Sequence, residues 1–205
     1  TDVTVLVNNA GITGASSLLS SPINEIREVF ETNVFGPLEL VRAFAPRLAA
    51  AGGGAVVDIH SVLSWLSFPG AYSPSKAAFW GITNSLRIEL AGQGTQVVGA
   101  HLGFTDTPMV AHLDVEKGAP DEIVRNILDS LEAGASEALA DEITVQVRAG
   151  LSNSTTGAMW TSAVIVDAVR TPLAKGKPGG AYSEIHPVDL HAHALKALVD
   201  RTGID

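Results

Sequence analysis

The chain contains no cysteine, which excludes disulfide bonds, thiolate metal sites and a cysteine nucleophile. Basic residues are also scarce: 13 Lys and Arg stand against 22 Asp and Glu, a formal net charge of −9, so we expect no nucleic-acid partner. No apolar run approaches the roughly 20 residues of a membrane span, which predicts a cytoplasmic protein without a membrane partner. The six histidines show no metal-ligand spacing, and we expect no metal site.

Apolar residues, in contrast, make up 46% of the chain, and their pattern alternates along the sequence. Short apolar runs rich in Val and Ile predict buried strands, and longer stretches with helical spacing predict helices between them. This alternation favours an α/β fold, with a parallel sheet and helices on both faces. The expected strands are 3–7, 55–60, 96–102 and 137–140, and the expected helices are 22–50, 72–91, 121–132 and 141–151.

The stretch YSPSK places Tyr72 and Lys76 one helical turn apart. A lysine ammonium at this spacing favours the phenolate, so we predict that Lys76 lowers the pKa of Tyr72 below its usual value of about 10. Such a tyrosine exchanges protons with an alcohol or a carbonyl oxygen, and Ser61 could hold the same oxygen if the loop after strand 55–60 folds back. The spacing alone also fits two surface side chains on one helix face.

Several motifs occur together in a fixed order: VLVNNAGI at 5–12, VVDIHS at 56–61, AYSPSKAA at 71–78 and LGFTDTPM at 102–109. Over residues 1–151 they resemble the short-chain dehydrogenase/reductase family. The resemblance implies a Rossmann-type doubly wound fold. It also implies an NAD- or NADP-dependent oxidoreductase that interconverts a small-molecule alcohol and a carbonyl.

The same resemblance implies roles for individual residues. Tyr72 would be the acid/base, Lys76 would lower its pKa and bind the nicotinamide ribose, and Ser61 would orient the substrate oxygen. Asn33 would hold a water of the proton relay. In this family the helices at 22–50 and 72–91 pair between subunits, which implies a homo-oligomer. The implied cofactor-binding residues are Asn9, Ala10, Gly11, Tyr72, Lys76, Gly103, Phe104 and Thr107.

Two features depart from the family pattern. Leu102 stands where the family usually has proline, and the interval from Ser61 to Tyr72 is shorter than in relatives. We therefore expect either a tighter loop or a part of the serine role taken by Ser64.

Other residues near these motifs allow only less specific predictions. His60 and His101 end strands, and we expect them to be packed or hydrogen-bonded rather than catalytic. Trp65, Phe68 and Met109 either line a substrate pocket or only cover the helix.

A Rossmann-type sheet begins with a strand followed by a Gly-rich turn that meets the dinucleotide pyrophosphate. No such turn occurs here, because Gly52, Gly53 and Gly54 precede a strand instead of following one. The sequence therefore predicts a truncated Rossmann-type sheet whose opening strand lies at an unpaired edge. We also predict that this chain alone binds NAD(P) weakly or not at all, and tight micromolar binding in calorimetry would contradict this.

The C-terminal part of the sequence has a different pattern. It predicts a linker at 152–161, followed by an extension of one strand and one helix. Residues 162–205 resemble the N-terminal segment of a thiolase, an acetyl-CoA acetyltransferase, through VDAVRTP at 166–172 and the HPVDL stretch at 186–190. Thiolases use a cysteine nucleophile, which this chain lacks. Two alternatives to the oxidoreductase remain: an acyltransferase acting through this segment, and an inactive fused fragment.

Overall fold

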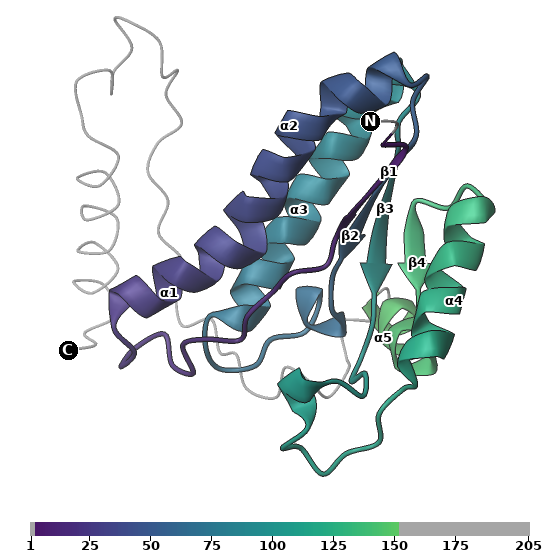
Figure 1. Ribbon diagram of the computed structural model, residues 1–205. Coiled ribbons are helices and arrows are strands. Elements are labelled where there is room, and N and C mark those ends of the chain that lie inside the picture. Colours follow the sequence, from purple (N-terminus) through teal and green to yellow (C-terminus); the bar gives the residue numbers. More distant parts are fainter. Residues whose placement is uncertain (1–2, 152–205) are drawn as a thin grey trace, which may run out of the picture. The chain divides into compact units, whose positions relative to one another are not determined.

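The computed structural model describes residues 3–151, which form a parallel sheet with helices on both sides (Figure 1). All three pairings between neighbouring strands are parallel, in the spatial order β1-β2-β3-β4. The predicted α/β class and parallel sheet are confirmed. The strands are β1 (Val5–Asn8), β2 (Ala55–Ile59), β3 (Gln96–His101) and β4 (Glu137–Leu139).

Alternate side chains of the central strands serve two separate cores. Val56 and Val97 face α2 and α3, where they pack with Leu48 and other apolar side chains. Val57 and Val98 point to the opposite face, where α4 supplies its isoleucines. This two-sided burial explains why the strands are almost continuously apolar. The helices are α1 (Ile23–Phe30), α2 (Gly36–Ala50), α3 (Tyr72–Leu90), α4 (Pro120–Glu132) and α5 (Glu142–Gly150).

The helical segment predicted at 22–50 is interrupted in the structure. A π-helical turn, Glu31–Phe35, separates α1 from α2 and contains the buried Asn33. Such turns often mark functional sites within helices, because they redirect one side chain out of the regular spacing. Periodicity alone could not show this break, since the apolar spacing continues through it.

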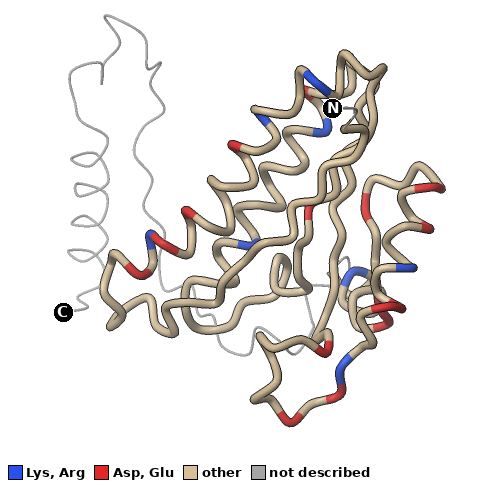
Figure 2. The backbone as a smooth tube through the Cα atoms, in the orientation of Figure 1, with Lys and Arg blue, Asp and Glu red and all other residues tan. Residues whose placement is uncertain are grey.

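Charge is nearly absent from the sheet and concentrated on helices and loops (Figure 2). In the four strands only Asp58 and Glu137 carry a formal charge. Within residues 3–151, β1 pairs with β2 alone, and Val5 and Val7 are 46% and 54% exposed. The predicted exposed edge is therefore confirmed for the described part of the chain.

Searching residues 3–151 finds no helix whose length and hydropathy would suit it to crossing a membrane. The linker predicted at 152–161 and the thiolase-like segment predicted at 162–205 lie outside the described residues.

Candidate active site

Three adjacent parallel strands end at the same edge of the sheet, and the predicted site residues follow them. Asn9 comes after β1, Ser61 comes after β2 and Gly103 comes after β3. The N-terminus of α3, which carries Tyr72, belongs to the same region. In open α/β sheets ligands bind outside the carboxyl ends of the strands, so the topology alone selects this edge.

Ser61 begins a tight turn and uses its side chain to cap it. Its Oγ accepts a hydrogen bond from the Leu63 amide at 3.1 Å, and the Ser61 amide donates to Ser64 Oγ at 3.4 Å. Because Oγ of Ser61 accepts from the backbone, its own proton remains available to a second oxygen. The segment after Ser61 is thus a tight, capped turn in this structure, and both alternatives for the serine role stay predictions. Ser64 is buried and hydrogen-bonded within the turn.

Tyr72 is the first residue of α3, is half-buried, and has a hydrogen bond between its hydroxyl and the Ser61 side chain. Burial raises the pKa of Tyr72 above its usual value of 10.0, and the Ser61 hydroxyl opposes this only in part. The prediction that Lys76 lowers this pKa is therefore wrong for the structure. Lys76 Nζ lies over the ring, 5.7 Å from its centroid, and burial of the phenol dominates.

Lys76 is buried, with 4% of its surface exposed, and its ammonium is oriented by the backbone. Nζ donates to the Ile59 carbonyl oxygen at 2.8 Å. Burial lowers the pKa of Lys76 to about 8, while the negative charge of Asp58 raises it. An ammonium has three donors, and within the described residues one of them has a protein acceptor, so Lys76 can bind an oxygen-rich ligand.

Asn33 connects the segment after β1 with α3. Its Nδ2 donates to the Ile12 carbonyl and to Ser75 Oγ, both at 2.9 Å, and its Oδ1 accepts from the Ile12 amide at 2.8 Å. These contacts use both amide protons, so the predicted relay water could bind this side chain only at Oδ1.

Gly11 lies between Asn33 and Lys76. A Cβ added there would be 3.4 Å from Asn33 Oδ1 and 3.7 Å from Lys76 Nζ. Glycine keeps this approach to the Lys76 ammonium open, whereas the neighbouring Asn9 and Ala10 are exposed to solvent.

The loop after β3 is fixed at its start. The Gly103 amide donates to Asp141 Oδ2 at 2.6 Å, and a side chain at this position would overlap Ile143. Phe104 and Thr107 follow as exposed residues, and the hydrogen bonds of both stay within their own loop. Gly103 is thus placed by the fold, and the predicted cofactor contacts of Phe104 and Thr107 stay predictions.

Asp58 is a buried carboxylate beside the site that the sequence reasoning missed. It is fully buried in β2 and accepts hydrogen bonds from Asn8 Nδ2 at 2.8 Å and Thr83 Oγ1 at 2.7 Å. Burial raises the pKa of Asp58, against the lowering effects of these hydrogen bonds and of Lys76. A carboxylate inside the apolar run AVVDI was the available signal, since a buried acid needs partners.

The structure distinguishes Trp65 from Phe68 and Met109, the three residues whose roles the sequence left undecided. Trp65 packs inward, with its ring stacked on His101 at a centroid distance of 4.0 Å. Phe68 and Met109 are 55% and 42% exposed on the surface. Trp65 is partly buried and packs on His101, which favours the covering role for it.

The expectation that His60 and His101 are packed is confirmed, since both are buried. Burial lowers the pKa of His60 well below its usual value and that of His101 to about 4. The unfolded chain binds these protons near pH 6.5, whereas the folded chain does not. Stability is therefore fully present above about pH 6.5 and falls as pH decreases toward 4.

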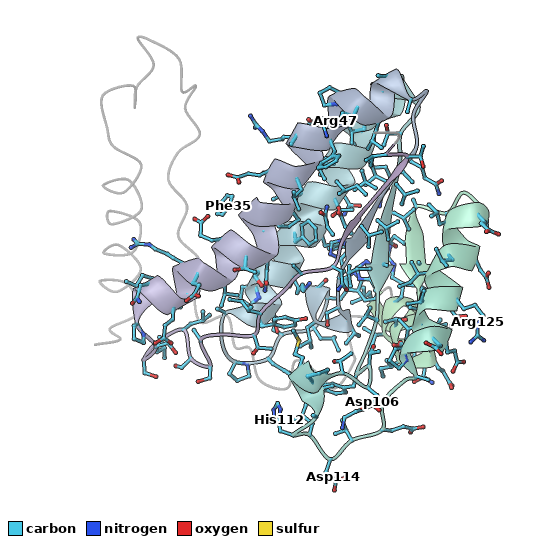
Figure 3. All side chains as sticks on the ribbon, in the orientation of Figure 1. Phe35, Arg47, Asp106, His112, Asp114 and Arg125 are labelled. Atoms are coloured by element: carbon cyan, nitrogen blue, oxygen red, sulfur yellow. The ribbon has the colours of Figure 1, made fainter. Side chains whose placement is uncertain are left out.

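Replacing His60 with leucine should weaken this acid dependence, because neither ring nitrogen of His60 has a hydrogen-bond partner within residues 3–151. Urea denaturation at neutral and acidic pH measures the effect, with an expected loss of at most about 1.4 kcal/mol per pH unit per histidine in the unmodified chain. His112 lies exposed on the loop before α4 (Figure 3), so His112→Gln serves as the control. Equal pH dependence in the His60→Leu variant and the unmodified chain would contradict the assignment.

The fold and the site together define the class of Rossmann-like α/β proteins that hold a tyrosine, a lysine and a serine at the carboxyl edge of a parallel sheet. A family model described as short chain dehydrogenase matches residues 1–118. The chain belongs to this family.

Individual relatives agree with this assignment. The chain is similar to 2-(R)-hydroxypropyl-CoM dehydrogenase of Xanthobacter autotrophicus, with 34% identity over 146 residues, covering 69% of this chain and 58% of that protein. It is also similar to 1-deoxy-11-beta-hydroxypentalenate dehydrogenase of Streptomyces exfoliatus, with 37% identity over 123 residues, covering 58% of this chain and 45% of that protein. The chain thus spans about half the length of these curated relatives.

Solved structures show the same likeness. A short chain dehydrogenase from Burkholderia cenocepacia J2315, crystallised in complex with NADP, superposes with a TM-score of 0.70 and 34% identity. The match covers 74% of this chain and 66% of that one. A short-chain dehydrogenase from Streptomyces avermitilis gives a TM-score of 0.63 and 29% identity, with the same two coverages.

Proposed function

We propose that the chain carries the proton-transfer site of an NAD(P)-dependent oxidoreductase that interconverts a small-molecule alcohol and a carbonyl. The observation that carries the proposal is the hydrogen bond between the Tyr72 hydroxyl and the Ser61 side chain, beside the buried Lys76. The dehydrogenase names of the relatives and the NADP bound to the Burkholderia cenocepacia structure support the reaction type and the cofactor class.

Tyr72 is the proton donor in the direction of carbonyl reduction. Because burial raises the pKa of Tyr72, the hydroxyl is protonated at neutral pH and can give its proton to a carbonyl oxygen. In the reverse direction the same oxygen accepts the proton of an alcohol. Ser61 donates a hydrogen bond to the reacting oxygen, because its contact with the Leu63 amide uses Oγ as an acceptor and leaves the hydroxyl proton available.

The remaining site residues hold the cofactor and the geometry. Lys76 offers its free ammonium donors to the ribose, and Asn33 fixes the segment carrying Asn9, Ala10 and Gly11 through Ile12. When NAD(P) is bound, it supplies or accepts the hydride at the carbon of the substrate. Phe104 and Thr107 complete the proposed cofactor set with Gly103.

The proposal is tested by nicotinamide-dependent turnover of a panel of secondary alcohols and ketones at millimolar NAD(H) or NADP(H). We expect Ser61→Ala to lower kcat, because the reacting oxygen loses a positioned donor. Ser85 is an exposed serine on α3, so Ser85→Ala is the matched control and should retain full activity. Turnover by the Ser61→Ala variant equal to that of the unmodified chain would refute the assignment.

Self-association through α2 and α3 is also part of this proposal. Phe35 and Leu40 at the start of α2 are each 46% exposed, Ile88 on α3 is 80% exposed, and Phe35 points away from the helices in Figure 3. Exposed apolar side chains of this size fit a contact between two copies. Sedimentation of the Phe35→Ser variant against the unmodified chain tests it, since equal masses in both would contradict the contact.

No relative reported above supports acyl transfer through residues 162–205, and the chain has no cysteine for it. The thiolase resemblance of this segment and the expected cytoplasmic location remain proposals.

A further inference from the structure

His101 is a fully buried side chain at the end of β3 that reaches the turn carrying Ser61. Its Nδ1 lies 3.4 Å from the carbonyl oxygen of Ser61. Its ring stacks on the indole of Trp65, with centroids 4.0 Å apart and planes inclined by 20°. Ser61 and Trp65 flank the 3₁₀ turn Val62–Ser64, so one buried ring contacts both ends of the turn.

The surroundings of His101 fix the orientation of its ring. Glu137 Oε1 lies 3.8 Å from His101 Nε2, and the same carboxylate accepts from Trp80 Nε1 at 3.0 Å and from Arg148 Nη2 at 2.8 Å. The Arg148 guanidinium also lies over the Trp65 ring, 5.3 Å from its centroid. Rotation of the imidazole would therefore disrupt contacts from β4, α3 and α5 together.

The contacts of His101 also favour one tautomer of its imidazole ring. The Ser61 carbonyl can only accept, so Nδ1 of His101 carries the proton. In the neutral ring Nε2 then has a lone pair, and within the described residues Nε2 has no hydrogen-bond partner. Burial lowers the pKa of His101 to about 4 and keeps the ring neutral at physiological pH, although the hydrogen bond to the Ser61 carbonyl and the charge of Glu137 act in the opposite direction.

We propose that His101 is a positioning residue for Ser61, holding the serine turn through its Nδ1 hydrogen bond so that the Ser61 hydroxyl meets Tyr72. This inference deepens the proposed function and rests on it. His101 acts through Ser61, because its contact is with the backbone of the serine whose side chain binds the tyrosine hydroxyl.

The test measures the pKa of the Tyr72 hydroxyl, which the Ser61 hydrogen bond lowers. The chain has two tyrosines, so labelling with ¹³Cζ-tyrosine gives two signals, and Tyr72→Phe identifies that of Tyr72. The Ser61→Ala variant gives the size of the upward shift in the Tyr72 pKa that is expected when the serine contact is lost. Two variants then separate the roles of the ring: His101→Phe keeps an aromatic face for Trp65 without a donor, and His101→Asn keeps a donor near the position of Nδ1 without the ring.

We expect His101→Phe to raise the pKa of Tyr72 in the same direction as Ser61→Ala, and His101→Asn to restore it toward the value of the unmodified chain. His112→Gln, at an exposed histidine, should leave the titration unchanged. The proposal is overturned if the pKa of Tyr72 shifts no more in His101→Phe than in His112→Gln. Equal shifts in His101→Phe and His101→Asn also overturn it, because packing alone would then account for the effect.

A second measurement uses the unmodified chain, so it does not depend on whether a His101 variant folds. Long-range ¹H–¹⁵N correlation of the histidine rings in the unmodified chain should show His101 as the neutral Nδ1–H tautomer, whereas the Nε2–H tautomer or an imidazolium at neutral pH overturns the proposal. If Ser61→Ala itself leaves the Tyr72 titration unchanged, the serine–tyrosine contact and with it the proposed function fail. If Ser61→Ala shifts the titration and His101→Phe does not, only the role of His101 fails.

Discussion

Replacing Tyr72 with phenylalanine is expected to lower NAD(P)-dependent turnover by about 10²–10⁴-fold, the usual contribution of a positioned acid/base. The substitution removes only the hydroxyl that contacts Ser61. The ring that lies 5.7 Å from Lys76 Nζ is kept, so folding and dinucleotide affinity should change little. Steady-state kinetics and calorimetric titration with dinucleotide, run on the same preparation, measure the two quantities separately.

The chain provides a matched control for this experiment. Tyr182 is its second tyrosine, and Tyr182→Phe should keep the activity of the unmodified chain. A Tyr72→Phe variant that retains more than about a tenth of the activity would show that the proton comes from elsewhere, since acid/base groups contribute more than this.

Replacing Asp58 with leucine is expected to cause the largest loss of stability. Asn8 Nδ2 and Lys76 are buried partners of this carboxylate, the first through a hydrogen bond of 2.8 Å and the second through its charge. Each buried donor left without an acceptor costs about 1–3 kcal/mol of the free energy of unfolding. Urea denaturation, followed by far-UV circular dichroism, measures the loss.

Asp58→Asn is the corresponding control, because an amide oxygen still accepts from Asn8. The Thr83 hydroxyl already lies 3.0 Å from the Phe79 carbonyl and can donate there instead. We therefore expect a smaller loss of stability than with leucine. The negative charge that raises the pKa of Lys76 is removed, so this pKa should fall below about 8, which ¹⁵N NMR of the Lys76 ammonium can follow. Equal destabilisation by both variants would contradict this account of Asp58.

The sequence predicted the elements of the sheet well, and the reason is burial on two faces. The runs at 55–60 and 96–102 are apolar because Val56 and Val57, like Val97 and Val98, enter opposite cores, and such runs are recognisable without a structure. The break at Glu31–Phe35 was not predicted, since the apolar spacing continues through it, and the Asn33 side chain there is hydrogen-bonded to residues distant in the sequence.

The helical placement of Tyr72 and Lys76 was predictable, whereas their electrostatics were less so. Spacing placed Tyr72 and Lys76 on one turn of a helix, which the structure confirms. The pKa of each depends first on how deeply it is buried, and that of Lys76 also depends on the charge of Asp58. The predicted lowering of the Tyr72 pKa therefore failed, because a sequence motif carries no measure of burial.

The central claim is that Tyr72 and Ser61 form one hydrogen-bonded unit in which the half-buried phenol keeps its proton. Titration of the Tyr72 ¹³Cζ signal in the unmodified chain and in Ser61→Ala tests this most directly. The account predicts a pKa above the ordinary 10.0 in the unmodified chain and a higher one still without the serine hydroxyl. A Tyr72 that titrates at or below its ordinary value, identically in both proteins, would contradict it.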